Sequence, residues 1–176
     1  VVRKSFKTNQ LLFNLVTTSD GLDQFSISKF IDFLLTIFGE RMAGLIHTIN
    51  DETGDRTIAT AGSEQLVYGN EKIVEELLGL QFEISMKSFF QTNPKAAEKL
   101  YSKVVEYVLE DQTKVDNTVV MDLFCGTGTI GQIVAAKSNN AKIIGVDIDF
   151  VTILNYFVQN KSRYLENRDW LCIGTI

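Results

Sequence analysis

Short β-type runs fill the first half of the chain, and turn-forming residues such as Gly21 and Gly62 separate them. Such runs bounded by turn residues are typical of β-strands. We therefore expect a small sheet in this half. The predicted strands cover 10–18, 44–50, 56–60, 64–69 and 78–85.

A helical period is found between the first two of these strands. Residues 26–41 place apolar side chains on one stripe, and Gly39 follows as a candidate C-cap. The pattern predicts a mixed sheet with one or two helices, of which this is the first. The stripe consists of Phe30, Ile31, Leu34, Leu35 and Phe38.

A longer helix is predicted over residues 93–111. Asn93 is a candidate N-cap, and Pro94 occupies the first helical position, where its missing N–H costs nothing. The buried stripe of this helix is predicted to contain Ala97, Leu100, Tyr101, Val104, Val105, Val108 and Leu109.

The last third of the chain alternates strand and helix patterns. After a turn at 115–117, the order is a buried strand, a glycine loop, a helix, a buried strand and a second helix. This order is typical of a parallel, doubly wound sheet. We therefore expect an α/β protein, with a small mixed domain at 1–85 and a Rossmann-like domain at 86–176. The four elements around the loop cover 118–124, 129–138, 141–147 and 149–162.

Composition limits the possible functions. The 176 residues are 45% hydrophobic and carry a net charge of −5, which suits a packed core better than non-specific binding to nucleic acid. No apolar run has the roughly 18 residues of a membrane span, and no signal peptide is recognisable. Two cysteines and one histidine are too few for a disulfide framework or a Cys/His zinc site, so we expect a cytoplasmic protein. The missing initiator Met and the apolar end suggest a piece of a longer chain.

The glycine loop is the strongest candidate for a ligand site. Residues 122–131 read DLFCGTGTIG, and Asp147 ends the following strand 21 residues after Gly126. Glycines before a helix let backbone N–H groups approach a ligand, and an acid after the second strand can bind ribose hydroxyls. A dinucleotide and S-adenosylmethionine both fit this pattern, and the third possibility is a packing loop without a ligand.

Asp122 helps to distinguish the two ligands. It lies four residues before Gly126, where a dinucleotide fingerprint usually continues as apolar strand. A carboxylate beside a pyrophosphate would bring two anions together in a poorly solvated cleft. The same carboxylate suits a ligand with an ammonium and a sulfonium group, so the residues favour S-adenosylmethionine.

Two motifs of the chain resemble those of the uracil-5 RNA methyltransferases, which make 5-methyluridine in tRNA and rRNA, and they follow one another in the family's order. DLFCGTGTIG looks like their cofactor motif, and ISMKSFFQTNPKAAEKLY (84–101) is similar to their S-F-x-Q-x-N segment. The resemblance is firm over 82–147. It is looser upstream, where it includes Arg3-Lys4-Ser5 and a Val67-Tyr68-Gly69 segment placed before a further helix.

The resemblance implies an S-adenosylmethionine site and a role for each matching residue. Gln91 would touch the cofactor and face the target base, Phe124 would pack on the cofactor, and Asp147 would bind its ribose. Thr129 would supply a polar contact, and the remaining positions would complete the amino-acid end of the pocket. These remaining positions are Asp122, Gly126, Thr127 and Gly128.

The chain also departs from this family. The family's catalytic cysteine, its catalytic glutamate and its D-P-P-R motif have no counterpart here, and neither does the basic N-terminal barrel of many relatives. We therefore expect an inactive fragment of an enzyme that methylates carbon 5 of a uridine in rRNA or tRNA. The fragment could self-associate through its incomplete sheet. Another class I methyltransferase, an NAD-dependent oxidoreductase and a non-catalytic binding module remain alternatives.

Three reactive side chains are interpreted as structural. Cys125 lies inside the cofactor loop and is expected to be a small buried thiol between strand and helix. Cys172 lies in a strand-like run with no base near it in sequence. His47 lies in a predicted strand without neighbouring metal ligands, which favours a structural or rim position.

Overall fold

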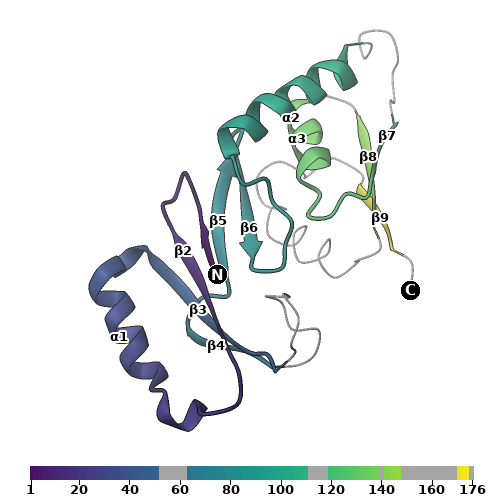
Figure 1. Cartoon of the computed structure of the whole chain (residues 1–176). Coiled ribbons are helices and arrows are strands. Elements are labelled where there is room, and N and C mark those ends of the chain that lie inside the picture. Colours follow the sequence, from purple (N-terminus) through teal and green to yellow (C-terminus); the bar gives the residue numbers. More distant parts are fainter. Residues whose placement is uncertain (52–62, 111–118, 139–140, 148–169, 175–176) are drawn as a thin grey trace. The chain divides into compact units, whose positions relative to one another are not determined.

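The structure is a computed structural model that describes residues 1–51, 63–110, 119–138 and 141–147, and the backbone of 170–174. The chain divides into two compact units (Figure 1). The first unit comprises Val1–Glu75 and Glu83–Lys87, and the second unit comprises Glu76–Phe82 and Ser88–Ile176. The predicted elements at 56–60, 115–117 and 149–162 lie outside the described residues.

The first unit contains a mixed four-stranded sheet, as its short strand-like runs predict. Strands β1 and β2 are antiparallel, β2 and β3 are parallel, and β3 and β4 are antiparallel, in the order β1-β2-β3-β4. The parallel pair needs a crossover connection, which the segment containing α1 provides. The strands are β1 (Val2–Lys4), β2 (Leu11–Thr17), β3 (Met42–Ile49) and β4 (Glu64–Gly69).

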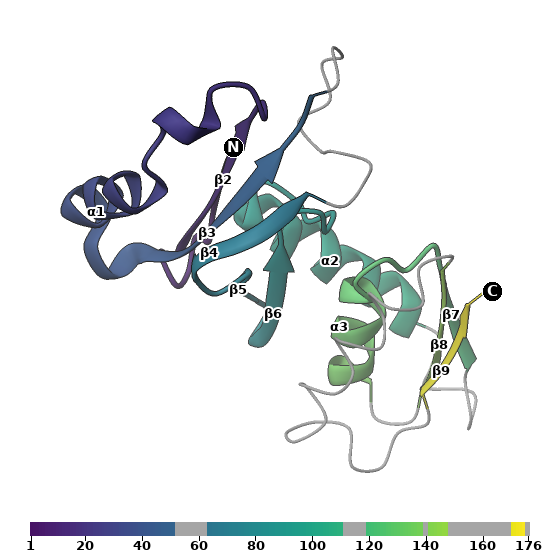
Figure 2. The same cartoon turned by 90° about the horizontal axis from the view of Figure 1, so that it is seen from below.

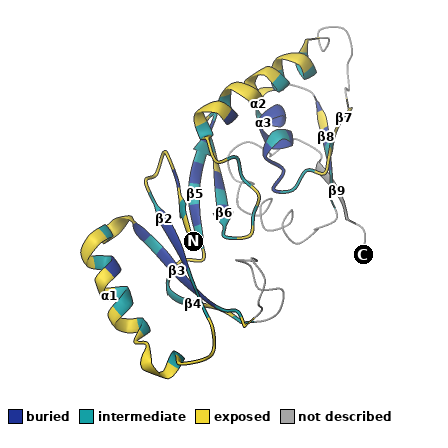
Figure 3. Ribbon diagram, viewed as in Figure 1, coloured by how far each residue is buried: buried dark blue, intermediate teal, exposed yellow. Residues whose placement is uncertain are grey.

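Helix α1 (Ile27–Phe38) packs its apolar stripe against this sheet, as predicted. Its N-cap Ser26 accepts a hydrogen bond from the Lys29 N–H, and its C-cap Gly39 has a φ of 54°. Two short 3-10 turns, Leu22–Gln24 and Gly39–Arg41, lie before and after the helix. Burial follows the sheet, and β2 and β3 are dark blue over much of their length in Figure 3. The buried cluster contains Leu11, Phe13, Leu34, Met42 and Leu45.

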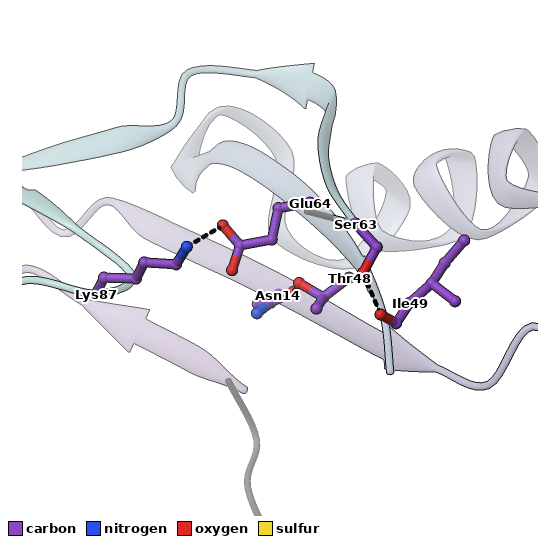
Figure 4. Close-up of polar contacts among 6 residues, drawn as sticks. All are labelled: Asn14, Thr48, Ile49, Ser63, Glu64 and Lys87. Carbon is purple, nitrogen blue, oxygen red and sulfur yellow. Dashed lines mark hydrogen bonds and ion pairs between the residues drawn. The ribbon is translucent and has the colours of Figure 1, made fainter. Parts of the chain in front are cut away.

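The buried polar side chains of β2 and β3 have partners within the first unit. Thr48 Oγ1 donates to Asn14 Oδ1 at 2.8 Å (Figure 4), and His47 shares a 2.9 Å hydrogen bond with Thr17. Both pairs satisfy groups that would otherwise be costly to bury. His47 is therefore a structural histidine, as expected from its sequence position.

The start of β4 is fixed by two further polar contacts. Figure 4 shows the Ser63 hydroxyl donating to the Ile49 carbonyl oxygen, and Lys87 paired with Glu64 at 2.9 Å. Lys87 belongs to the first unit although it is distant in sequence. The ion pair is partly exposed, so it contributes about 1 kcal/mol or less.

Glycines allow β3 and β4 to approach closely at one point. Gly44 lies opposite Gly69, and a Cβ atom on Gly44 would lie 1.8 Å from the Asn70 carbonyl oxygen. Gly69 has a φ of 65°, and a Cβ there would lie 2.2 Å from the Ala43 carbonyl oxygen. Any larger residue at either position would push backbone against backbone.

The segment after Gly69 is a β-hairpin, so the helix expected there from the family resemblance is wrong. Strands β5 (Lys72–Leu77) and β6 (Leu80–Ser85) are joined by Leu78 and Gly79, with φ of 51° and 85°. Positive φ at both central residues is typical of a type I′ turn. Glu75 is buried where the alternation requires an apolar residue, which hides the strand pattern in the sequence. Its carboxylate accepts from the backbone N–H groups of Phe6 and Lys7.

Helix α2 (Pro94–Leu109) begins as its sequence predicts. Asn93 Oδ1 accepts from the Ala96 N–H at 3.1 Å, and Pro94 opens the helix. Ala97 and Tyr101 are buried, but Leu100 is 53% exposed, so its predicted place in the stripe is wrong. Glu98 accepts from the Leu78 N–H at 3.3 Å, which holds the hairpin turn against α2.

The second unit also contains a parallel sheet in the order β7-β8-β9, and the predicted α/β class is confirmed (Figure 2). Helix α3 packs against β8 and α2, and its Val134 and Ala135 form a buried cluster with Ile143 of β8. The prediction that the first strand is buried is wrong for one of its faces, because Val119, Met121 and Leu123 are more than half exposed. The elements are β7 (Val119–Leu123), α3 (Thr129–Lys137), β8 (Lys142–Asp147) and β9 (Trp170–Gly174).

Candidate functional site

The glycine loop connects the carboxyl end of β7 to the amino end of α3. Phe124, Gly126 and Gly128 all have left-handed backbone conformations, with φ of 58°, 51° and 68°. The Cys125 N–H donates to the Val146 carbonyl oxygen of β8, and the Gly128 N–H donates back to the Cys125 carbonyl oxygen at 2.7 Å. The chain therefore makes a tight turn, and Gly128 is the N-cap of α3.

Two carboxylates hold this loop, one from each neighbouring strand. Asp147 Oδ2 accepts from the Gly126 N–H at 2.6 Å, and Asp122 Oδ2 accepts from the Gly131 N–H at 2.9 Å. Strands β7 and β8 are parallel, with Leu123 opposite Val146, so both acids lie at the same end of the sheet. The carboxyl ends of parallel strands are where ligands bind in open α/β sheets.

The electrostatics of this end of the sheet disfavour a second negative charge. Burial raises the pKa of Asp122 above its usual value, the hydrogen bond from Gly131 lowers it, and the charge of Asp147 raises it again. The increase is the net result, because the group is partly withdrawn from water beside another acid. A cationic ligand group near Asp122 would relieve this cost, whereas a pyrophosphate would increase it.

The threonines of the loop are turned inward. Thr127 and Thr129 are buried and share a 2.8 Å hydrogen bond between their hydroxyl groups. Gln132 Nε2 donates to the Thr127 carbonyl oxygen at 3.2 Å. The polar contact of Thr129 in this structure is thus with its neighbour, and the pair stabilises the shape of the loop.

Phe124 combines an unfavourable backbone with an exposed ring. Its side chain is 91% exposed, and its φ of 58° is rare for a residue with a Cβ atom. Such a conformation costs on the order of 1–3 kcal/mol and tends to occur at functional sites. The ring is accessible just beyond the carboxyl end of β7.

Gln91 lies in the segment just before α2, outside any described helix or strand. Tyr101 lies on the buried face of α2. Burial raises the pKa of the Tyr101 phenol, the Gln91 side chain lowers it, and the charge of Asp122 raises it again. The pattern indicated Tyr101 only as a core residue, because its ring does lie on the buried stripe.

The cysteines and the potential metal ligands give no second site in the described part of the chain. Cys125 is half-buried rather than fully buried as expected, and its thiol is unbridged. Cys172 lies in β9, as its strand-like run predicts. Among the described residues, no group of three His, Cys, Asp or Glu side chains could hold a metal ion. None of the described helices is long and apolar enough to span a membrane.

A strand, a glycine loop, a helix and a second strand that ends in an acid are the arrangement typical of nucleotide sites on parallel sheets. Sequence comparison is more specific. The chain is 43% identical over 149 residues to an uncharacterized RNA methyltransferase of Clostridium tetani and 41% identical over 150 residues to one of Clostridium acetobutylicum. These matches cover 84% of this chain and 30% of each relative. A second Clostridium acetobutylicum protein of the same description is 32% identical over 97% of this chain.

These similarities support an RNA methyltransferase family for the chain, which spans about a third of the length of the curated relatives it matches. No protein-family profile matches it. Among solved structures, the chain resembles the Pyrococcus abyssi tRNA (uracil-54, C5)-methyltransferase in complex with S-adenosyl-L-homocysteine. The TM-score is 0.69 with 22% identity, over 99% of this chain and 38% of the other. The fold is therefore that of S-adenosylmethionine-dependent methyltransferases.

Proposed function

We propose that this chain forms the S-adenosylmethionine-binding part of an RNA methyltransferase of the uracil-5 type. In this proposal, residues 1–85 form a central α/β domain, and residues 86–176 form part of the methyltransferase domain. The whole protein would act on a uridine of rRNA or tRNA in the cytoplasm. The similarity to bacterial RNA methyltransferases supports the enzyme class, and the resemblance of two motifs supports the uracil-5 type.

The observation that carries the cofactor assignment is the pair of carboxylates at one end of the parallel sheet. Asp122 and Asp147 face the same glycine loop, and each raises the electrostatic cost of an added anion. A ligand with an ammonium and a sulfonium group lowers that cost, and a dinucleotide pyrophosphate does not. The residues present therefore fit S-adenosylmethionine, which supplies an electrophilic methyl group when bound.

Each loop residue has a role that its position allows. Asp147, at the end of β8, would bind the ribose hydroxyls, and Asp122 would attract the cationic end of the cofactor. Phe124 would cover the cofactor with its exposed ring. The left-handed glycines let the backbone approach the ligand, and the buried threonine pair supports the turn between them. These glycines and threonines are Gly126, Thr127, Gly128 and Thr129.

Gln91 would contact the cofactor and the target base. Its amide offers both a donor and an acceptor, which suits the edge of a uracil. The resemblance places the catalytic cysteine and glutamate outside these 176 residues, so we expect no methyl transfer by the chain alone. Self-association of the chain is expected through its incomplete sheet, in which one face of β7 is exposed.

A calorimetric titration tests the cofactor assignment. S-adenosylhomocysteine should bind to the chain, NADH should not, and Asp147→Ala should weaken the binding. Asp32→Ala is the matched control, since Asp32 is an exposed acid of α1 in the first unit. Binding of NADH alone would replace the methyltransferase proposal with the oxidoreductase alternative. If neither ligand binds, repeating the titration on the full natural protein decides whether the loop is a cofactor site at all.

Methylation of RNA by the full natural protein tests the uracil-5 type. We expect 5-methyluridine to appear in rRNA or tRNA from a strain that lacks the gene after incubation with the protein. Methylation at another base would instead favour a different class I methyltransferase. Mass spectrometry of nucleosides after digestion distinguishes these outcomes.

A further inference from the structure

The region of β1 and the loop that follows it is basic in a chain that is acidic overall. The net charge of the 176 residues is −5, yet Arg3, Lys4 and Lys7 all precede the first acid, Asp20. Lys4 and Lys7 are exposed, and within the described part of the chain no acid forms an ion pair with either of them. Their charges can therefore attract an anionic partner.

An aromatic ring lies between these two lysines in the sequence. Phe6 is 48% exposed. A single exposed apolar side chain is common on protein surfaces, so its exposure alone indicates little. Phe6 differs from such a side chain because it is flanked by cations and because hydrogen bonds hold its loop in one conformation.

A buried carboxylate of β5 fixes the backbone that carries the ring. Glu75 is 1% exposed, and its two oxygens accept from the N–H groups of Phe6 and Lys7, the second at 2.9 Å. Burying a carboxylate is costly unless hydrogen bonds compensate for the lost water. Both N–H groups are directed toward a buried acceptor, while the side chains of Phe6 and Lys7 are exposed at the surface.

The rest of the loop is fixed to the same strand. Thr8 Oγ1 donates to the Val74 carbonyl oxygen at 2.7 Å, and the Val74 N–H donates to Gln10 Oε1 at 2.7 Å. The buried Ser5 hydroxyl accepts from the Thr8 N–H at 3.1 Å, which closes the turn. Since the backbone of the loop is already ordered, binding a ligand here requires little further loss of conformational entropy.

Lysines that flank an exposed ring suit a single nucleic-acid strand. The lysines attract phosphates, and the ring can stack an unpaired base. An acidic peptide would use the lysines without the ring, and a duplex keeps its bases stacked on one another. The overall negative charge of the chain requires that any such contact be local, as this one is.

We propose that Lys4, Phe6 and Lys7 bind an unpaired segment of the RNA substrate, with one base stacked on the Phe6 ring and phosphates beside the two lysines. This inference rests on the proposed function, because that function makes RNA the substrate. The site belongs to the first unit, whereas the glycine loop belongs to the second.

The first test compares Phe6→Leu with Phe33→Leu in the full natural protein. Leucine retains an apolar side chain but has no aromatic face, so a packing role survives the change and stacking does not. Phe33 is the control, because it is a 59% exposed phenylalanine of α1 in the same unit. By fluorescence anisotropy, the affinity for a short unstructured oligouridine should fall about fivefold to hundredfold in Phe6→Leu only.

Two further measurements separate stacking from loss of folding. Phe6→Trp restores an aromatic face and should bind the oligouridine at least as tightly as the wild type. An oligomer with the same backbone but without bases should bind Phe6→Leu and the wild type equally. Urea unfolding of each variant verifies that the comparison is made between folded proteins.

The second test addresses the lysines through the salt dependence of binding. Lys4→Gln and Lys7→Gln should each reduce the slope of log affinity against log salt by about 0.7, the value for one phosphate contact on a single strand. Lys29→Gln is the charge-matched control and should leave the slope unchanged, because Lys29 is an exposed lysine of α1. Phe6→Leu should also leave the slope unchanged, because the ring neutralises no phosphate.

The outcomes separate this inference from the proposed function. Equal affinity of Phe6→Leu and the wild type for the oligouridine overturns the site, while methyl transfer to RNA by the wild type keeps the proposed function intact. An equal loss of affinity for the oligomer without bases also overturns it. Unchanged RNA affinity with a loss of self-association in Phe6→Leu would make the loop a protein contact instead.

Absence of both RNA binding and methyl transfer in the wild type overturns the inference and the proposed function together. A base-dependent loss of affinity in Phe6→Leu, with reduced salt slopes in the two lysine variants, supports the assignment.

Discussion

The sheet of the first unit and the strand ends beside the glycine loop of the second unit differ in how their polar side chains are arranged. In the first unit, polar groups inside the sheet are paired with one another, as Asn14 is with Thr48 and His47 with Thr17. In the second unit, Asp122 and Asp147 lie at the same end of the sheet, and the charge of each raises the free-energy cost of ionising the other. Pairing stabilises the fold, whereas two carboxylates at one end of a sheet, each also bonded to a backbone N–H, favour a ligand of opposite charge.

The backbone shows the same contrast. In the first unit, positive φ at Gly69 occurs at a glycine and allows two strands to approach closely. In the second unit, a comparable φ occurs at Phe124, where the side chain makes it costly. Asn9 of the first unit has a φ of 59° as well, so it is the exposed ring of Phe124, and not the positive φ alone, that favours a binding role for the loop. Four substitutions test this distinction.

The largest effect is expected from Gly44→Ala in the first unit. The new Cβ would lie 1.8 Å from the Asn70 carbonyl oxygen, so β3 and β4 must separate. Unfolding in urea should show a loss of about 3 kcal/mol, as for overpacked cores. Gly21→Ala is the control, because Gly21 has a φ of 70° but open space around it. It should lose only about 1–2 kcal/mol, and an equal loss at both positions would mean that close approach is not the cause.

The next effect concerns binding rather than stability. Asp147→Ala should weaken S-adenosylhomocysteine binding about tenfold to hundredfold, because a charged hydrogen-bond acceptor is lost. The urea midpoint should change little, since the carboxylate also carries a repulsive interaction with Asp122. Calorimetry and urea unfolding on the same sample compare the two. A large loss of stability with unchanged affinity would place Asp147 among the structural acids and contradict the distinction between the units.

A smaller effect, on stability and not on binding, is expected from Thr48→Val. The substitution keeps the shape but leaves the buried Asn14 amide without its hydroxyl partner. Stability should fall by about 1–2 kcal/mol, and the affinity for S-adenosylhomocysteine should stay the same. Urea unfolding and calorimetry again measure both quantities. Thr36→Val on α1 is a control, because the Thr36 hydroxyl is exposed and bonds only the Asp32 carbonyl oxygen in the same helix.

The smallest effect is a pH dependence from Asp122→Asn. The pKa of Asp122 is raised in the folded protein, so its contribution to stability is complete below the usual aspartate pKa of about 4 and is lost as pH rises through the folded-state value. Asparagine keeps an oxygen for the Gly131 N–H but does not titrate. The variant should therefore gain stability relative to the wild type between acidic and neutral pH. Urea unfolding at several pH values measures the gain, and a constant difference would contradict it.

The fold was largely predictable where a single pattern decides the structure. The stripe and caps of α1 and α2 identify both helices, and the order of elements around Gly126 predicts the parallel sheet. Prediction failed where a residue does not match the environment in which the structure places it. Glu75 is buried in β5 because backbone N–H groups neutralise its cost, and no sequence period contains that information.

The candidate site was predictable in its residues and not in their connections. Motif positions identify Asp122, Asp147 and Gln91, but they do not show that the two carboxylates accept from the backbone N–H groups of the glycine loop. Asp122 accepts from Gly131 and Asp147 accepts from Gly126. A contact between residues that are distant in sequence depends on tertiary packing, which local spacing does not describe.

Phe124 has a consequence for the range of substitutions that its position can accept. Glycine would remove the conformational penalty of a φ of 58° and would stabilise the chain, since glycine adopts positive φ freely. The same change would delete the ring that we assign to the cofactor. In a library of all variants at position 124, selection for folding should therefore enrich glycine, and selection for methyl transfer by the full natural protein should enrich aromatic residues. Natural selection at this position would then have preserved the less stable residue.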